Sequence, residues 1–116
     1  MKKVYTLSTC TTSKRILKEL DLAQKGFEIQ DIKLEAITES QLEEMKAMAG
    51  SYEALFSRIA RKYKELGLKD QQLNENEYRK FILEEYTFLK RPVIIADKLI
   101  FIGNTKKNIE AAAQAI

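Results

Sequence analysis

The chain has 116 residues, of which 45% are hydrophobic and 32% charged, and this composition predicts one folded domain over residues 1–116. Its formal net charge of +3 comes from 20 Lys and Arg against 17 Asp and Glu spread along the chain, without the clustered basic face that direct nucleic-acid binding requires. The lack of His and the single Cys exclude His-dependent triads, the commonest metal sites and an intramolecular disulfide, so we expect no metal and no bound cofactor.

The first elements predicted along the chain are a strand, a helix and a second strand. Residues 2–7 are rich in β-forming side chains, and residues 12–26 place apolar side chains at helical spacing before Gly26, which we expect to end the helix. This helix has three candidate caps, Thr11, Thr12 and Ser13. Residues 27–36 then return to an alternating pattern through Phe27, Ile29 and Ile32. This order predicts a right-handed βαβ unit.

The middle of the chain, residues 38–90, predicts helices and no strand. Its glycines, Gly50 and Gly67, fall where the helical patterns break. The predicted helices are residues 38–50 with Thr38 or Ser40 as cap, residues 51–68 with Leu55, Phe56, Ile59, Tyr63 and Leu66 as apolar stripe, and residues 74–90 with Asn74 or Asn76 as cap.

The last part of the chain predicts a β-hairpin and a closing helix. Residues 91–104 hold two β-rich runs around Asp97-Lys98, and residues 105–116 form a helix capped by Asn104 or Thr105. The whole order, β-α-β, helical insertion, β-β-α, defines an α/β fold. Because no apolar run approaches the roughly 20 residues needed to span a bilayer, we expect a cytoplasmic protein without a membrane partner.

Cys10 lies between the first predicted strand and the first predicted helix. The N–H groups and dipole at a helix N-terminus favour a thiolate, which is the reactive form of the side chain. Thr11, Thr12 and Ser13 can donate hydrogen bonds to that anion, and Lys14 and Arg15 add positive charge. The alternative is that Cys10 is a small buried hydrophobic residue, which is how most free cysteines behave.

Arg91-Pro92 is the second candidate feature, at the start of the predicted hairpin. An X-Pro bond at this position is a candidate cis peptide, which would turn the preceding side chain toward a neighbouring site. Arg91 would then offer its guanidinium to a thiolate or an oxyanion. The alternative is a solvated surface arginine.

Three stretches together give a family resemblance: Cys10-Thr11-Thr12-Ser13, "YKELGLKD" and "FLKRPVIIADKLIFIG". In this order they resemble the arsenate reductase and Spx family. The resemblance implies a thioredoxin-like fold with a mixed four-stranded sheet, in which residues 38–90 are a helical insertion within a single domain.

The resemblance also implies roles for individual residues. Cys10 matches the nucleophile that attacks arsenate and is regenerated through glutathione and glutaredoxin. Arg91 and Pro92 match the arginine and the cis-proline of the site, and Arg58 lies near the position of a second, oxyanion-binding arginine, with Arg61 one turn later.

The chain departs from the family pattern at two places. A third arginine of the glutaredoxin-coupled enzymes is missing where this chain has Gly103 and Asn104. Ser13 stands where Spx-type regulators carry a second cysteine, so the resolving thiol must come from another molecule.

The predicted function is therefore a thiol-dependent oxidoreductase that acts on an oxyanion such as arsenate or on a glutathione mixed disulfide. One alternative is an Spx-like regulator that binds RNA polymerase, and another is a glutathione-binding protein with a different task.

Overall fold

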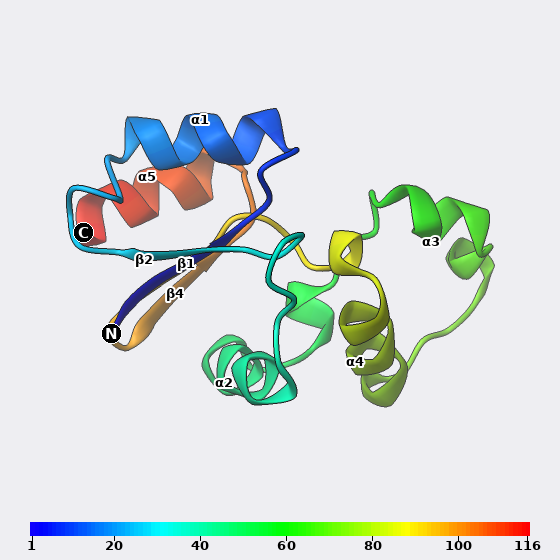
Figure 1. Ribbon diagram of the computed structural model, residues 1–116. Coiled ribbons are helices and arrows are strands. Elements are labelled where there is room, and N and C mark those ends of the chain that lie inside the picture. The colour runs from blue at the N-terminus through cyan, green and yellow to red at the C-terminus, as the bar shows by residue number, and fades with distance from the viewer. The chain divides into compact units, whose positions relative to one another are not determined.

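The computed structural model describes residues 1–116 (Figure 1). The chain divides into two compact units, one formed by Met1–Ala36 with Arg91–Ile116 and the other by Ile37–Lys90. None of the helices has the length and apolar character required to cross a membrane.

The first unit contains a four-stranded sheet with the strand order β2-β1-β3-β4. The strands are β1 Lys2–Thr6, β2 Glu28–Asp31, β3 Val93–Ala96 and β4 Leu99–Ile102. β1 pairs parallel with β2 and antiparallel with β3, which pairs antiparallel with β4. The predicted mixed four-stranded sheet is therefore confirmed.

Helices α1 (Thr11–Glu19) and α5 (Lys106–Ala115) lie side by side on one face of this sheet (Figure 1). Val4 and Ile94, directly opposite each other on β1 and β3, form the centre of the core that the helices cover. The other buried members of this core are Ile16, Leu20, Leu22, Phe27, Ala96 and Ala112. Thr105 caps α5 through its side chain, as one of the two predicted alternatives.

The first helix is shorter than predicted, because α1 ends at Glu19 instead of continuing to Gly26. Asp21 adopts a positive φ of 53°, and the Leu22 N–H donates to the Leu17 carbonyl at 3.2 Å. At about 100° per residue, a continued helix would turn Leu22 away from the buried stripe of Ile16. Ending the helix early lets Leu22 enter the core, where it is fully buried.

The second strand also departs from its predicted pattern. Ile29 is 44% exposed, whereas Gln30 is 2% exposed. β2 is an edge strand of the sheet, so the alternation of its side chains does not indicate which face of the strand is fully covered. The Gln30 amide donates to the Glu35 carbonyl at 3.0 Å, which compensates for burial of this polar group.

The second unit is helical. Its helices are α2 Glu39–Ala49, α3 Arg61–Glu65 and α4 Glu75–Glu84, separated by the 3₁₀ turns η1 Glu53–Leu55, η2 Leu68–Asp70 and η3 Tyr86–Phe88. Thr38 and Asn74 cap α2 and α4, and each forms a complete capping box with the residue three positions later. These two helix starts agree with the sequence prediction.

The predicted continuous helix over residues 51–68 is wrong, because the chain is extended at Phe56. Phe56 forms a β-bridge with Leu89, the Ser57 N–H donates to the Phe88 carbonyl at 2.7 Å, and the Lys90 N–H donates to the Leu55 carbonyl at 2.9 Å. Pairing between distant segments thus replaces the helical hydrogen bonds. Ile59, placed on the predicted apolar stripe, is 89% exposed as a result.

Candidate active site

Cys10 is the N-cap residue of α1, with extended backbone angles of φ −98° and ψ 105°. Its N–H donates to the Leu7 carbonyl at 2.9 Å, which closes the loop after β1, and its carbonyl accepts from the Lys14 N–H at 3.1 Å. The expected side-chain caps, Thr11, Thr12 and Ser13, do not hold the cap position, because the helix begins one residue earlier than that prediction required. The sulfur is therefore carried at the first turn of the helix, where unpaired N–H groups favour a negative charge.

Ser13 provides the direct hydrogen bond to the sulfur. Its Oγ–H donates to Cys10 Sγ at 3.3 Å, and its side chain is fully buried, whereas Cys10 is half-buried. Thr11 is exposed and Thr12 is half-buried. Of the three hydroxyls expected to stabilise a thiolate, Ser13 is the one in contact with it.

Arg91 contributes to the same site from the segment that precedes β3. Tyr5 is paired with Val93, so Arg91 and Pro92 come just before β3 beside the loop that follows β1. The Arg91-Pro92 peptide bond is cis. Sequence-distant segments, residues 7–13 and 91–92, are thus joined by the antiparallel pairing of β1 and β3.

The environment lowers the pKa of the Cys10 thiol. Burial acts in the opposite direction and is the largest single influence, because it disfavours the charged form. The hydroxyl and backbone N–H of Ser13, followed by the positive charge and hydrogen bond of Arg91, together outweigh burial. The net effect raises the fraction of nucleophilic thiolate at neutral pH.

Asp31 contacts the loop that leads from β1 to Cys10, and the sequence did not predict this contact. Its Oδ1 accepts hydrogen bonds from the Ser8 N–H at 3.3 Å and the Lys33 N–H at 3.0 Å. The Ser8 side chain is the main cause of the lowered pKa of the Asp31 carboxyl. Because β1 and β2 are parallel, their carboxyl ends share one edge, and an acidic residue ending β2 was the signal available in the sequence.

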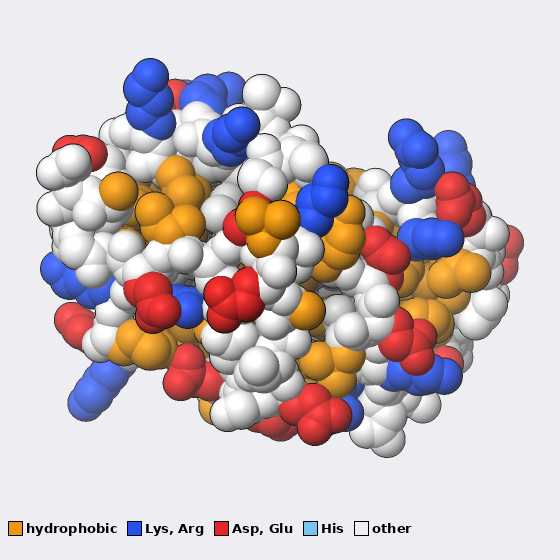
Figure 2. All heavy atoms as spheres, viewed as in Figure 1, with side chains coloured by type: hydrophobic (Ala, Val, Ile, Leu, Met, Phe, Trp, Pro, Cys, Tyr) orange, Lys and Arg blue, Asp and Glu red, His pale blue; other side chains and the backbone are white.

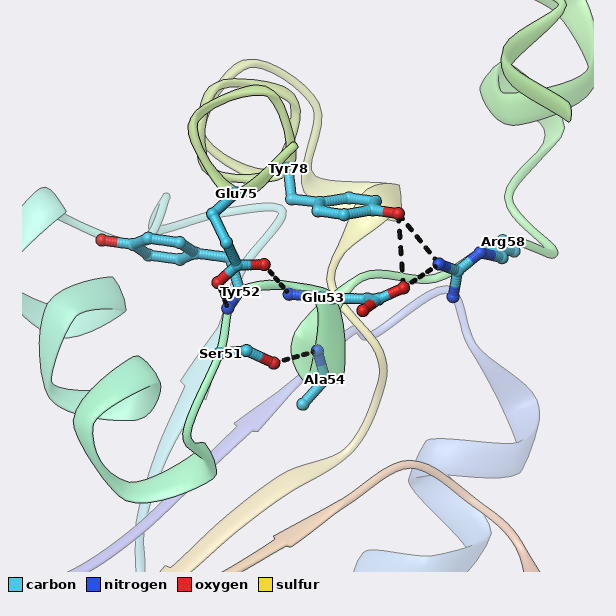
Figure 3. Close-up of polar contacts among 7 residues, drawn as sticks. All are labelled: Ser51, Tyr52, Glu53, Ala54, Arg58, Glu75 and Tyr78. Atoms are coloured by element: carbon cyan, nitrogen blue, oxygen red, sulfur yellow. Dashed lines mark hydrogen bonds and ion pairs between the residues drawn. The ribbon is translucent and has the colours of Figure 1, made fainter. Parts of the chain in front are cut away.

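Arg58 belongs to the second unit, where it has specific partners (Figure 3). Its Nη2 donates to Glu53 Oε2 at 2.7 Å and to the Tyr78 hydroxyl at 2.9 Å. Its guanidinium carbon lies 5.6 Å from the centre of the Tyr78 ring. The structure thus brings Cys10, Ser13 and Arg91 together, whereas the anion-binding role of Arg58 stays a prediction.

The charged surface is mixed. Figure 2 shows Lys and Arg side chains interspersed with Asp and Glu over the face drawn there. The side chains also form no cluster of three or more His, Cys, Asp or Glu suited to hold a metal ion. Cys10, with Ser13 and Arg91 beside it, is therefore the group of residues best suited to chemical reactivity.

Comparison with known proteins shows the family to which the chain belongs. The family model described as the ArsC family matches residues 5–112. The chain is 23% identical over 108 residues to the global transcriptional regulator Spx 2 of Bacillus anthracis. This match covers 91% of this chain and 82% of that protein.

Solved structures show the same fold. The arsenate reductase from Vibrio cholerae is 18% identical with a TM-score of 0.77, and the match covers 99% of this chain and 98% of that one. A Staphylococcus aureus COL protein is 28% identical with a TM-score of 0.75, over 96% of this chain and 97% of that one. These structures confirm the predicted thioredoxin-like architecture of the arsenate reductases.

Proposed function

Because this chain belongs to the ArsC family, we propose that it is a thiol-dependent oxidoreductase in which Cys10 is the nucleophile and an oxyanion such as arsenate is the substrate. The observation that carries the proposal is the contact of Ser13 with Cys10 at the start of α1, beside Arg91. A thiolate stabilised by donors and a cation is the form that attacks an electrophilic centre. The same cation can balance the charge of an approaching oxyanion.

The proposed reaction begins when the Cys10 thiolate attacks arsenic(V). A sulfur–arsenic bond forms as one arsenate oxygen takes up protons and leaves as water. Glutathione then attacks the Cys10 sulfur, and the electron pair of the sulfur–arsenic bond passes to arsenic, which leaves as arsenic(III). The mixed disulfide between Cys10 and glutathione is reduced by a second thiol, that of glutaredoxin, which regenerates Cys10.

Ser13 explains why both reducing thiols come from outside the chain. Its hydroxyl cannot form a disulfide with Cys10, but it donates a hydrogen bond to the sulfur that reacts. The residue therefore supports the nucleophile and leaves its resolution to glutathione and glutaredoxin. Such coupling fits a cytoplasmic protein, because glutathione keeps thiols reduced in that compartment.

Arg58 is the second proposed anion-binding residue. The guanidinium holds five N–H donors, and the hydrogen bonds to Glu53 and Tyr78 both use Nη2. Nε and Nη1 therefore retain hydrogens for an oxyanion. Arg61, the alternative from the sequence, is also exposed and lies at the start of α3.

The test is arsenate reduction with glutathione and glutaredoxin, measured for the wild type and for Cys10→Ser. We expect the wild type to release arsenic(III) and Cys10→Ser to show only background. Thr11→Ala is the matched control, since it changes an exposed neighbour and should retain activity. Equal rates for the wild type and Cys10→Ser, or a Cys10 thiol with an ordinary pKa and no reduction, would reject the proposal.

A second candidate function is an Spx-like regulator that binds RNA polymerase. The similarity to the Bacillus anthracis regulator favours it. The discriminating measurement is co-purification of the tagged chain with RNA polymerase subunits. Stable co-purification that Cys10→Ser leaves unchanged, together with no arsenate reduction, would favour this alternative.

A further inference from the structure

Glu53 is held in place from two directions in the second unit (Figure 3). The Glu75 carboxylate, in the first turn of α4, accepts hydrogen bonds from the backbone N–H groups of Tyr52 at 2.7 Å and Glu53 at 3.1 Å. The Ser51 hydroxyl accepts from the Ala54 N–H at 3.1 Å. The start of η1 is therefore fixed, and Glu53 begins that turn with its carboxylate toward Arg58.

Arg58 is held by one corner of its guanidinium. Nη2 donates to Glu53 and to the hydroxyl of Tyr78. The Tyr78 residue is only 7% exposed. The Tyr78 hydroxyl lies 3.4 Å from Glu53 Oε2, so the three groups form one closed arrangement. The Arg58 side chain is 45% exposed, which leaves the rest of its guanidinium accessible to a solute.

We propose that Glu53 is the resident counter-ion of an oxyanion site at Arg58 and weakens that site by competing for the guanidinium charge. The inference rests on the proposed function, because it assumes that Arg58 binds the substrate class named there. Tyr78 is the positioning residue, since its hydroxyl keeps Nη2 engaged while Nη1 and Nε point away from it. The carboxylate thus sets the affinity of the site without contacting the sulfur chemistry.

Charge arithmetic gives the direction of the effect. An oxyanion bound at Nη1 or Nε would approach the negative Glu53 carboxylate that already neutralises the same guanidinium. Glu53→Gln keeps an oxygen acceptor for Nη2 but removes that charge. Partly exposed charges a few ångströms apart interact by about 1 kcal/mol, so we expect the Kd for arsenate to fall about threefold to tenfold.

The pair is a weak contributor to stability, which keeps the test interpretable. Both side chains are largely accessible, 45% for Arg58 and 56% for Glu53, and exposed ion pairs add little to folding. The N–H groups of Tyr52 and Glu53 keep their acceptor on Glu75 in Glu53→Gln. This variant should therefore fold like the wild type.

The experiment is a titration of the protein with sodium arsenate alone in a Cys10→Ser background. Binding is monitored through the ¹H–¹⁵N signal of the Arg58 Nε–H group. This background excludes covalent chemistry, so the measurement stands apart from the reductase assay. We expect Glu53→Gln to bind about threefold to tenfold more tightly and Tyr78→Phe to bind more weakly. Glu39→Gln removes an equal charge from the ion pair with Arg79 in the same unit and should match the background.

Three results would overturn the inference. These are binding by Glu53→Gln no tighter than by Glu39→Gln, arsenate binding that persists in Arg58→Gln when it is measured by calorimetry, and the absence of any Arg58 response in Glu53→Gln. If the Arg58 signal fails to respond while the wild type still reduces arsenate, the proposed function stands and the counter-ion role falls. If Glu53→Gln binds more tightly but no variant with Cys10 intact reduces arsenate, the counter-ion role stands alone.

Discussion

Replacing Ser13 by Ala removes the hydroxyl that donates to Cys10 Sγ at 3.3 Å but keeps the backbone N–H of the same residue. Because this hydrogen bond favours the thiolate, its loss moves the pKa of Cys10 back up. Hydrogen bonds to charged groups contribute about 1.5–3 kcal/mol, and we take about 1 kcal/mol because sulfur is a weak acceptor and half-exposed. This value corresponds to a roughly fivefold lower thiolate fraction at any pH below the pKa of both proteins.

The assay is the reaction of Cys10 with a neutral dipyridyl disulfide over a range of pH. A thiolate of higher pKa is intrinsically more nucleophilic, with a Brønsted slope of about 0.4–0.5, which offsets about twofold of the loss. We therefore expect Ser13→Ala to react about two to three times more slowly below the pKa of both proteins. Above the pKa of both proteins, where each thiol is fully ionised, Ser13→Ala should react faster.

The crossing of the two pH profiles is the decisive feature. Thr11→Ala changes an exposed side chain that follows Cys10 in the sequence, so it should react like the wild type at every pH. A Ser13→Ala profile lowered by one constant factor at all pH values would refute the reasoning. That result would mean that access to the sulfur had changed while its ionisation had not.

Three further substitutions test other parts of the structure. Arg91→Gln should slow alkylation by anionic iodoacetate about threefold more than by neutral iodoacetamide at low salt, because the guanidinium attracts the anion; equal slowing by both reagents would contradict an anion-binding role. Asn74→Ala should lower the free energy of unfolding in urea by about 1 kcal/mol through loss of the α4 cap, whereas exposed Asn76→Ala should change it little. Asp97 has a φ of 56°, so Asp97→Ala should be about 1 kcal/mol less stable than Asp97→Gly in the same urea titration, and equal stabilities would argue against strain at this turn.

The elements predicted best are those whose signals are local. The β-hairpin is an example, because two β-rich runs flank Asp97-Lys98, where the structure places the turn between β3 and β4. The starts of α2, α4 and α5 follow from side chains that cap their own helix within three residues. Such signals are complete within a short window of sequence, so they do not depend on the rest of the fold.

The break in the middle helix depended on contacts that no local window contains. Phe56 lies at helical spacing with Ile59 and Tyr63, and that pattern favours a helix. In the fold, however, Phe56 stacks on Phe88 with ring centroids 4.9 Å apart and pairs its backbone with Leu89. Burial of a large aromatic side chain and the bridge between distant segments outweigh local helix propensity there.

The candidate site shows the same division between local and non-local information. Cys10 and Arg91 stood out as residues, but the sequence offered three equivalent hydroxyls near the sulfur and no means of ranking them. The structure ranks them because Cys10 itself is the N-cap. Ser13 therefore lies buried in the first turn of α1, with its hydroxyl 3.3 Å from Cys10 Sγ. The position where a second cysteine would store an oxidising equivalent is thus occupied by a hydrogen-bond donor. A site built this way favours the ionised thiol, and the chain holds no second cysteine with which Cys10 could form an intramolecular disulfide.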